Sequence, residues 1–175
     1  MQRVAKFYKV SFEQFLKDYC DALELNINNE ETVIEVRRVW DSIKLPKRAT
    51  KGSAGYDIFS TMNIILQPKE NVKIPTGIKA KMDEGWVLKV YPKSGLGFKY
   101  RLQLDNVVGV IDGDYINSDN EGHIFVKLTN DTYEDKVVVI HEGDAMCQGI
   151  FIEYGITVDD NTDGIRNGGF GSTTK

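Results

Sequence analysis

The chain has 175 residues, of which 41% are hydrophobic and 10% aromatic, with 22 Lys and Arg against 26 Asp and Glu. A chain of this length and apolar content can bury a sizeable core, which excludes disordered and collagen-like classes and leaves no need for disulfide staples. The net charge of −4 argues against binding bulk nucleic acid, although it allows a local basic pocket for a small phosphorylated ligand. We expect one domain with at most an appendage.

Cysteine usage and the N-terminal sequence bear on the cellular compartment. Cys20 and Cys147 lie in unrelated contexts and are too few for a disulfide framework, so we expect two free thiols. His123 and His141 show no ligand spacing to each other or to cysteine, which predicts no zinc site. Residues 1–17 lack the apolar centre of a signal peptide, and no apolar run approaches the length of a membrane span. These features predict a cytoplasmic protein.

The first predicted element is an amphipathic helix over residues 11–25. Its apolar residues recur at the spacing of one helix face: Phe12, Phe15, Leu16, Tyr19, Cys20 and Leu23. Ser11 is the expected N-cap, with Gln14 three residues later as in a capping box. Polar residues at 26–31 end the helix, and residues 32–39 look like a strand. Residues 1–42 are therefore predicted to form a helical extension and connector.

Short β-prone runs dominate residues 43–158. They cover residues 64–66, 72–74, 77–80, 86–91, 107–111, 124–128, 137–140 and 146–152, with Gly, Asn and Asp clusters between them. Many short strands at near-regular spacing predict a β-sandwich, jelly roll or barrel. Residues 159–175 are rich in glycine, which is typical of a flexible tail. An arm that orders over a nucleotide would also explain Phe170 and Arg166 there, through base stacking and phosphate binding.

Two loops could carry chemistry, and each also has a purely structural interpretation. Residues 92–97 combine Lys93 with small residues that let backbone N–H groups approach phosphate oxygens, yet the same residues make ordinary turns. In residues 105–115, Asn106 and Asp112 flank an apolar run, as in a hairpin over a small ligand. An Asp at such a strand end can act as a general base on water, or it can simply form an Asx-turn.

Taken in chain order, five motifs resemble those of the trimeric dUTP diphosphatases (dUTPases). They are A-G-Y-D at 54–57, K-S-G-L-G at 93–97, N-V-V-G-V-I-D-G-D-Y at 106–115, G-D-A-M-C-Q at 143–148 and G-G-F-G-S-T at 168–173. The resemblance implies an all-β, dUTPase-like jelly roll of the β-clip type with an additional N-terminal helix. It also implies a homotrimer with active sites between subunits and Mg²⁺-dependent hydrolysis of dUTP to dUMP and pyrophosphate. In such a site, water attacks the α-phosphorus and the C-terminal arm closes over the nucleotide.

The resemblance assigns roles to matching residues. Asp112 would orient the attacking water, Tyr115 would lie under the deoxyribose, and Asp57 would contact the metal through water. The uracil edge would be read by Asn106 with the hairpin backbone at Gly109 and Ile111. The phosphates would be bound by Lys93, Ser94, Gly95 and Gln148, and by Arg166, Ser172 and Thr173 of the arm, whose Phe170 and Gly171 would cover the base.

The motifs depart from the family pattern at two positions and leave two rival functions open. Lys93 stands where the family usually has Arg, replacing a bidentate fork by a point charge. Arg166 lies one residue closer to Gly-Gly-Phe than is common in the family. One rival is a dCTP deaminase or a bifunctional dCTP deaminase/dUTPase. The other is a regulatory binding protein on this scaffold, with the N-terminal helix docking a partner.

Overall fold

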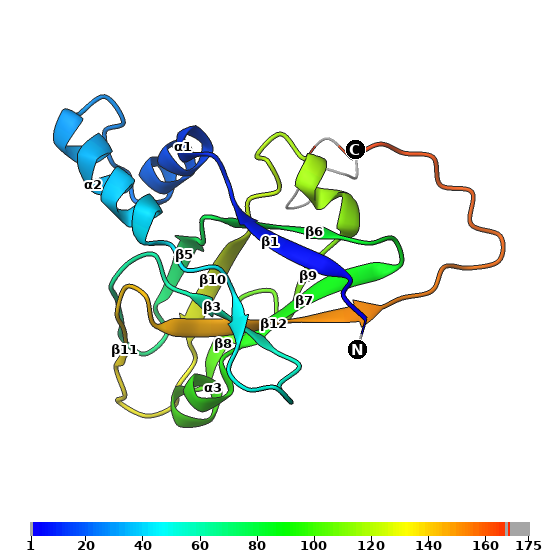
Figure 1. Ribbon diagram of the computed structural model, residues 1–175. Coiled ribbons are helices and arrows are strands. Elements are labelled where there is room, and N and C mark those ends of the chain that lie inside the picture. The colour runs from blue at the N-terminus through cyan, green and yellow to red at the C-terminus, as the bar shows by residue number, and fades with distance from the viewer. Residues whose placement is uncertain (1, 167, 169–175) are drawn as a thin grey trace.

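A computed structural model describes residues 2–166 and 168 (Figure 1). This part of the chain contains twelve strands, three α-helices and one 3₁₀ helix. The helices are α1 (Phe12–Ala22), α2 (Glu30–Ser42), α3 (Ser94–Tyr100) and the 3₁₀ helix η1 (Gly113–Asn117). The strands are β1 (Ala5–Lys9), β2 (Lys47–Arg48), β3 (Tyr56–Phe59), β4 (Ile64–Leu66), β5 (Asn71–Pro75), β6 (Ile78–Met82), β7 (Trp86–Pro92), β8 (Leu102–Leu104), β9 (Gly109–Ile111), β10 (Phe125–Asn130), β11 (Val138–Ile140) and β12 (Ala145–Glu153).

The strands form small antiparallel sheets around one β core. The largest sheet has the order β2-β3-β12-β7-β9, and a second has the order β5-β10-β8. Strands β1 and β6 pair separately, as do β4 and β11. This arrangement confirms the predicted all-β, jelly-roll-like class.

Side-chain alternation explains which faces the strands bury. In β10, Val126 and Leu128 point into the core, whereas Lys127 between them is exposed. Leu88 and Ile74 are among the fully buried residues of this core. All eight predicted runs contain a strand, but the run at 107–111 pairs only from Gly109, because the two residues before it belong to a turn.

The strand predicted at residues 32–39 is wrong, because these residues lie in helix α2. Val33, Val36, Val39 and Trp40 pack inward at spacings of three and four, which is a helix face rather than a strand alternation. Asn29 caps the helix by accepting a hydrogen bond from the Thr32 N–H at 3.1 Å. The β-branched residues favoured a strand locally, and the burial of this face overrides that preference.

Helix α1 confirms the predicted N-cap but ends three residues earlier than predicted. The Gln14 N–H donates to Ser11 Oγ at 3.1 Å. The reciprocal half of the capping box is absent, because the Gln14 side chain donates to Asp18 and the Ser11 N–H donates to Glu121. The cap is therefore shared between the helix and a distant loop.

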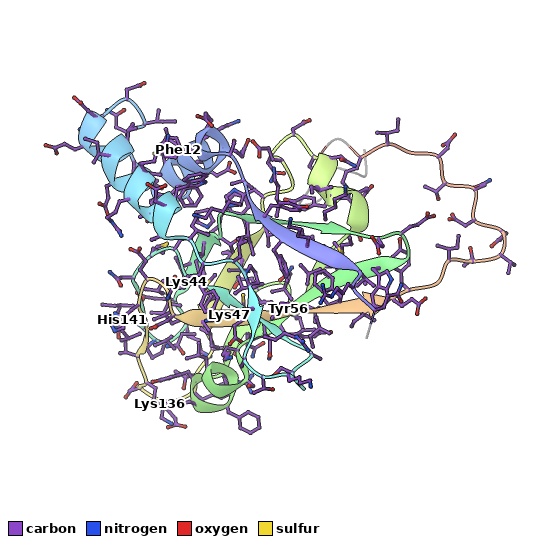
Figure 2. All side chains as sticks on the ribbon, viewed as in Figure 1. Phe12, Lys44, Lys47, Tyr56, Lys136 and His141 are labelled. Atoms are coloured by element: carbon purple, nitrogen blue, oxygen red, sulfur yellow. The ribbon has the colours of Figure 1, made fainter. Side chains whose placement is uncertain are left out.

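A second hydrophobic cluster fixes both helices to the β core. Phe15 and Val36 are at its centre, and Ile43 packs against both this cluster and the β core. Figure 2 shows Phe12 among the side chains of the two helices, where the Arg37 guanidinium lies 3.3 Å from its ring centroid. The division of the chain at residue 43 stays a prediction.

Both cysteines are buried free thiols, as predicted. Burial raises the pKa of the Cys147 thiol, which keeps it protonated and unreactive. None of the helices in the described part of the chain has the length and apolarity needed to cross a bilayer.

Glu121 connects α1 to the segment that follows η1. It accepts the Ser11 N–H at 3.0 Å and the Ser11 hydroxyl, and it pairs with Lys79 Nζ at 2.7 Å. Burial opposes ionisation of this carboxyl group, but the hydrogen bonds from Lys79 and Ser11 outweigh burial and lower the pKa of Glu121 to about 2.

The Glu121 bridge predicts a specific pH dependence of stability. Because the folded pKa is depressed, the carboxylate stabilises the fold fully above pH 4.5 and loses that effect as pH falls toward about 2. In Glu121→Gln, we expect unfolding free energy to fall less steeply than in the parent across this window. Urea unfolding at a series of pH values measures both slopes, and identical slopes would contradict the assignment.

Gly122 adopts a conformation that only glycine fits without strain. Its φ is +71°, and an added Cβ would lie 2.5 Å from Ile116 Cα and 2.8 Å from the Tyr115 carbonyl oxygen. We expect Gly122→Ala to cost about 3 kcal/mol of unfolding free energy. The matched control Gly85→Ala has a similar φ of +82° with open space around it, and should cost about 1 kcal/mol. If urea unfolding showed equal losses of free energy in the two variants, the backbone would have moved to relieve the overlap between the added Cβ and residues 115–116.

Candidate active site

A pocket of about 600 Å³ lies beside the β8–β9 turn, within the size range of small-molecule sites. Its lining contains Lys73, Val90, Leu104, Asp105, Asn106, Val108, Gly109, Val110, Ile111, Asp112, Tyr115, Phe125, Val126, Lys127 and Arg166. Six of these were predicted from the sequence as site residues: Asn106, Gly109, Ile111, Asp112, Tyr115 and Arg166. The structure therefore brings together six of the eleven predicted site residues that lie in its described part.

The turn between β8 and β9 shapes one wall of the pocket. The Val107 N–H donates to the Leu104 carbonyl at 2.8 Å, and the Val108 N–H donates to the Asn106 carbonyl at 2.6 Å. Val107 has a φ of 64°, which is strained for a β-branched residue, and its side chain is exposed. At Gly109, an added Cβ would lie 3.2 Å from Val90 Cβ, so the missing side chain lets β9 approach β7 closely.

Asp112 and Asp114 share one cation. Arg166 donates from Nη2 to Asp112 and from Nε to Asp114 at 2.7 Å. Both carboxylate side chains are about half exposed, at 50% and 52%, whereas the Arg166 side chain is only 15% exposed. Asp112 is the N-cap residue of η1 but makes no side-chain capping bond, so the alternative of an Asx-turn there is wrong. Its carboxylate faces the pocket and the arm.

Tyr115 is buried beneath the pocket and held at its hydroxyl. The hydroxyl donates to the His123 carbonyl at 2.9 Å and accepts from Asn120 Nδ2 at 3.0 Å. Burial raises the pKa of the Tyr115 hydroxyl, so it remains a neutral donor at ordinary pH. The Arg166 guanidinium lies 5.9 Å from the Tyr115 ring centroid. A flat aromatic surface in this position suits the face of a sugar or a base.

Five predicted residues gather elsewhere in the structure, at the end of β7. They are Asp57, Lys93, Ser94, Gly95 and Gln148, and none of them lines the pocket. Lys93 Nζ pairs with Asp57, and Gln148 lies opposite Asp57 in the β12–β3 ladder. Gln148 Nε2 donates to the Pro92 carbonyl at 3.2 Å. Residues 92–97, for which an ordinary turn was the structural alternative, instead lead into α3 with Lys93 as its N-cap residue.

The arrangement of acidic side chains bears on metal binding. Among residues 2–166 and 168, no group of three or more His, Cys, Asp or Glu side chains is placed to hold a metal ion. Asp57 is already neutralised by Lys93. A single carboxylate such as Asp57 can contact a hydrated Mg²⁺ through water, because Mg²⁺ keeps several of its waters in protein sites.

Lys73, Lys127 and Phe125 also line the pocket, although no sequence motif points to them. Lys73 and Lys127 are direct partners in the β5–β10 ladder, and Lys127 Nζ pairs with Asp105 at 2.9 Å. Each lysine alternates with apolar residues along its strand, which in a sequence looks like an ordinary solvent-facing position. Only the pairing register brings the two lysines to one place.

The arm reaches the pocket at Arg166. After β12, the chain follows a wide irregular course and returns beside η1, where Arg166 makes its bonds (Figure 1). The predicted site residues Phe170, Gly171, Ser172 and Thr173 lie outside the described residues.

Comparison with known proteins decides the family. A sequence profile of the dUTPase family matches residues 41–174. The chain belongs to the dUTPase family. It is 46% identical over 134 residues to the deoxyuridine 5′-triphosphate nucleotidohydrolase of Lactococcus lactis, an alignment that covers 75% of this chain and 88% of the relative.

Solved dUTPase structures share the fold. The crystal structure of the Streptococcus mutans dUTPase is 42% identical, with a TM-score of 0.57 over 65% of this chain and 88% of that one. A mutant dUTPase from phage phi11 of Staphylococcus aureus is 23% identical, with a TM-score of 0.56 over 69% of this chain and 90% of that one. That phage enzyme coordinates a structural Mg(II) ion.

The matched dUTPase profile begins at residue 41, at the end of α2. Helix α1 and nearly all of α2 therefore lie outside the family profile, although they pack firmly on this dUTPase fold.

Proposed function

We propose that the protein hydrolyses dUTP to dUMP and pyrophosphate, with water attacking the α-phosphorus. The observation that carries the proposal is Asp112, a half-exposed carboxylate on the rim of a nucleotide-sized pocket in a member of the dUTPase family. This activity limits uracil incorporation into DNA and supplies dUMP for dTMP synthesis. The cytoplasmic location predicted from the sequence stays a prediction.

In this proposal, the pocket binds deoxyuridine. Asn106 and the backbone at Gly109 and Ile111 recognise the uracil edge, because a hairpin backbone offers a fixed pattern of donors and acceptors. Tyr115 lies under the deoxyribose and leaves no room for a 2′-hydroxyl. Asp112 accepts a proton from the attacking water and aligns it with the α-phosphorus.

Arg166 changes partners during the proposed reaction. In the structure it bonds to Asp112 and Asp114. The β- and γ-phosphates are stronger, multiply charged acceptors, and they draw the guanidinium away. This exchange frees the Asp112 carboxylate for water when substrate arrives. Phe170 and Gly171 then cover the base, and Ser172 and Thr173 bind the phosphates.

We further propose a homotrimer in which the phosphate-binding residues come from a neighbouring subunit. Lys93, Ser94, Gly95 and Gln148 lie outside the pocket of their own chain, which supports a site shared between subunits. Mg²⁺ would be held by the phosphates and water, with Asp57 contacting it through water, and would neutralise charge on the phosphates. Phosphoryl displacement depends mainly on such positioning and charge neutralisation.

The decisive experiment is a pyrophosphate-release assay with dUTP, dCTP, dTTP and UTP in the presence of Mg²⁺, with ammonia recorded in parallel. Release from dUTP alone supports the proposal. Ammonia from dCTP would favour the dCTP deaminase or the bifunctional enzyme instead. Tight dUTP binding without turnover would favour a regulatory binding protein. Omission of Mg²⁺ should abolish the dUTP signal.

A further inference from the structure

Helix α1 lies outside the family profile but contacts the segment directly behind the pocket. Asp18 Oδ2 lies 2.6 Å from Nδ1 of His123, and the Asp18 side chain is only 14% exposed. Gln14 Nε2 donates to the same Asp18 oxygen at 2.8 Å, which fixes the carboxylate in place. Gln14 and Asp18, on successive turns of α1, thus fix the buried imidazole of His123.

The hydrogen bonds of His123 define its tautomer. The Gly77 N–H donates to Nε2 at 2.8 Å, so Nε2 carries no proton. The ring proton therefore lies on Nδ1 and is donated to Asp18. His123 is fully buried, with the Phe125 ring centroid at 4.5 Å. Neither ring nitrogen can change partner without moving α1 or the β5–β6 turn.

The backbone of His123 in turn positions Tyr115. The His123 carbonyl accepts the Tyr115 hydroxyl at 2.9 Å, and Asn120 Nδ2 bridges the same two oxygens at 3.0 and 3.3 Å. A continuous chain of bonds therefore runs from Asp18 through His123 to the aromatic ring that lines the pocket. The bonds from Asp18 and Gly77 to the imidazole therefore help to fix the residue whose carbonyl holds the Tyr115 hydroxyl.

We propose that Asp18 and His123 are positioning residues for substrate selection, holding the Tyr115 ring at the height that admits a 2′-deoxyribose and rejects a ribose. The inference rests on the proposed function, in which Tyr115 lies under the sugar. An apolar wall rejects an added hydroxyl only modestly, by roughly 10²-fold. Rejection of UTP then depends on a Tyr115 ring that does not move when the 2′-hydroxyl meets it. Asp18 of α1 supplies that rigidity through His123.

The test compares kcat/KM for dUTP and UTP in three variants. We expect Asp18→Ala to lower the dUTP/UTP ratio of kcat/KM about 10-fold, because the Tyr115 ring can then move away from the 2′-hydroxyl. The kcat for dUTP should stay within about twofold of the parent. Asp18→Asn should restore the ratio, since its amide oxygen still accepts the Nδ1 proton. Glu13→Ala removes an exposed carboxylate from the same helix and should leave the ratio unchanged. An unchanged ratio in Asp18→Ala would overturn the proposal.

A double-mutant cycle separates positioning from general destabilisation. Tyr115→Phe removes the hydroxyl through which Asp18 acts, so adding Asp18→Ala to Tyr115→Phe should change the ratio no further. The same loss in both backgrounds would overturn the proposal, because Asp18 would then act by another route.

A measurement on the parent protein avoids any loss of folding and needs no turnover. In ¹⁵N-histidine-labelled protein, the ring resonances of His123 should show the proton on Nδ1 both with and without a non-hydrolysable dUTP analogue, and the exposed His141 serves as reference. A proton on Nε2 of His123 would overturn the proposal, because Nδ1 would then not donate to Asp18. Absence of dUTP hydrolysis by the parent would instead overturn the proposed function.

Discussion

Asp112→Asn is expected to lower kcat for dUTP by about 10² or more while the affinity for a non-hydrolysable dUTP analogue stays close to that of the parent. The amide keeps the shape of the side chain and one oxygen for Arg166, but it cannot take a proton from water. Steady-state pyrophosphate release and calorimetric binding measure the two quantities. An unchanged kcat would refute the assignment of Asp112 as the base.

Asp114→Asn is the matched control for Asp112→Asn. Asp114 is equally exposed and also bonds to Arg166, but it does not line the pocket. We expect kcat of Asp114→Asn to stay within about fivefold of the parent. Comparable losses in both variants would show that the effect comes from the Arg166 ion pair rather than from a proton acceptor.

The β core could be predicted from the sequence because its signals are local. Runs such as β4 and β11 consist of β-branched and other apolar residues that favour strands, and turn residues separate them. Helix α2 was predicted as a strand because its β-branched residues favour one locally. The spacing of Val33, Val36 and Trp40 by three and four residues is nevertheless a helix signal, and the packing of this face against α1 follows it.

The site was predictable to the extent that its residues lie in continuous motifs. Asn106 and Asp112 belong to one motif, so their shared wall of the pocket follows from a short stretch of chain. The contacts that join distant segments left no such signal. Lys73 meets Lys127 only through the β5–β10 register, and Asp18 meets His123 across 105 residues.

The separation of Lys93 from the pocket leads to a second large expected effect. In the proposed homotrimer, one chain supplies Asp112 and its neighbour supplies Lys93 to the same site. Lys93→Ala should lower kcat/KM for dUTP at least about 10-fold, because a phosphate loses its cation. Each single variant is then defective at all of its sites.

Coexpression of Asp112→Asn with Lys93→Ala, carrying different tags, should recover activity. Random assembly makes about three quarters of the trimers mixed, and each mixed trimer holds one site in three with both residues intact, so activity should reach about a quarter of the parent value. As a control, Asp112→Asn coexpressed with the double variant Asp112→Asn/Lys93→Ala forms no intact site and should remain inactive. If the first mixture were no more active than its components, Asp112 and Lys93 would act within one chain. The triphosphate would then have to extend from the pocket to Lys93 of the same chain, with the arm holding it in that position.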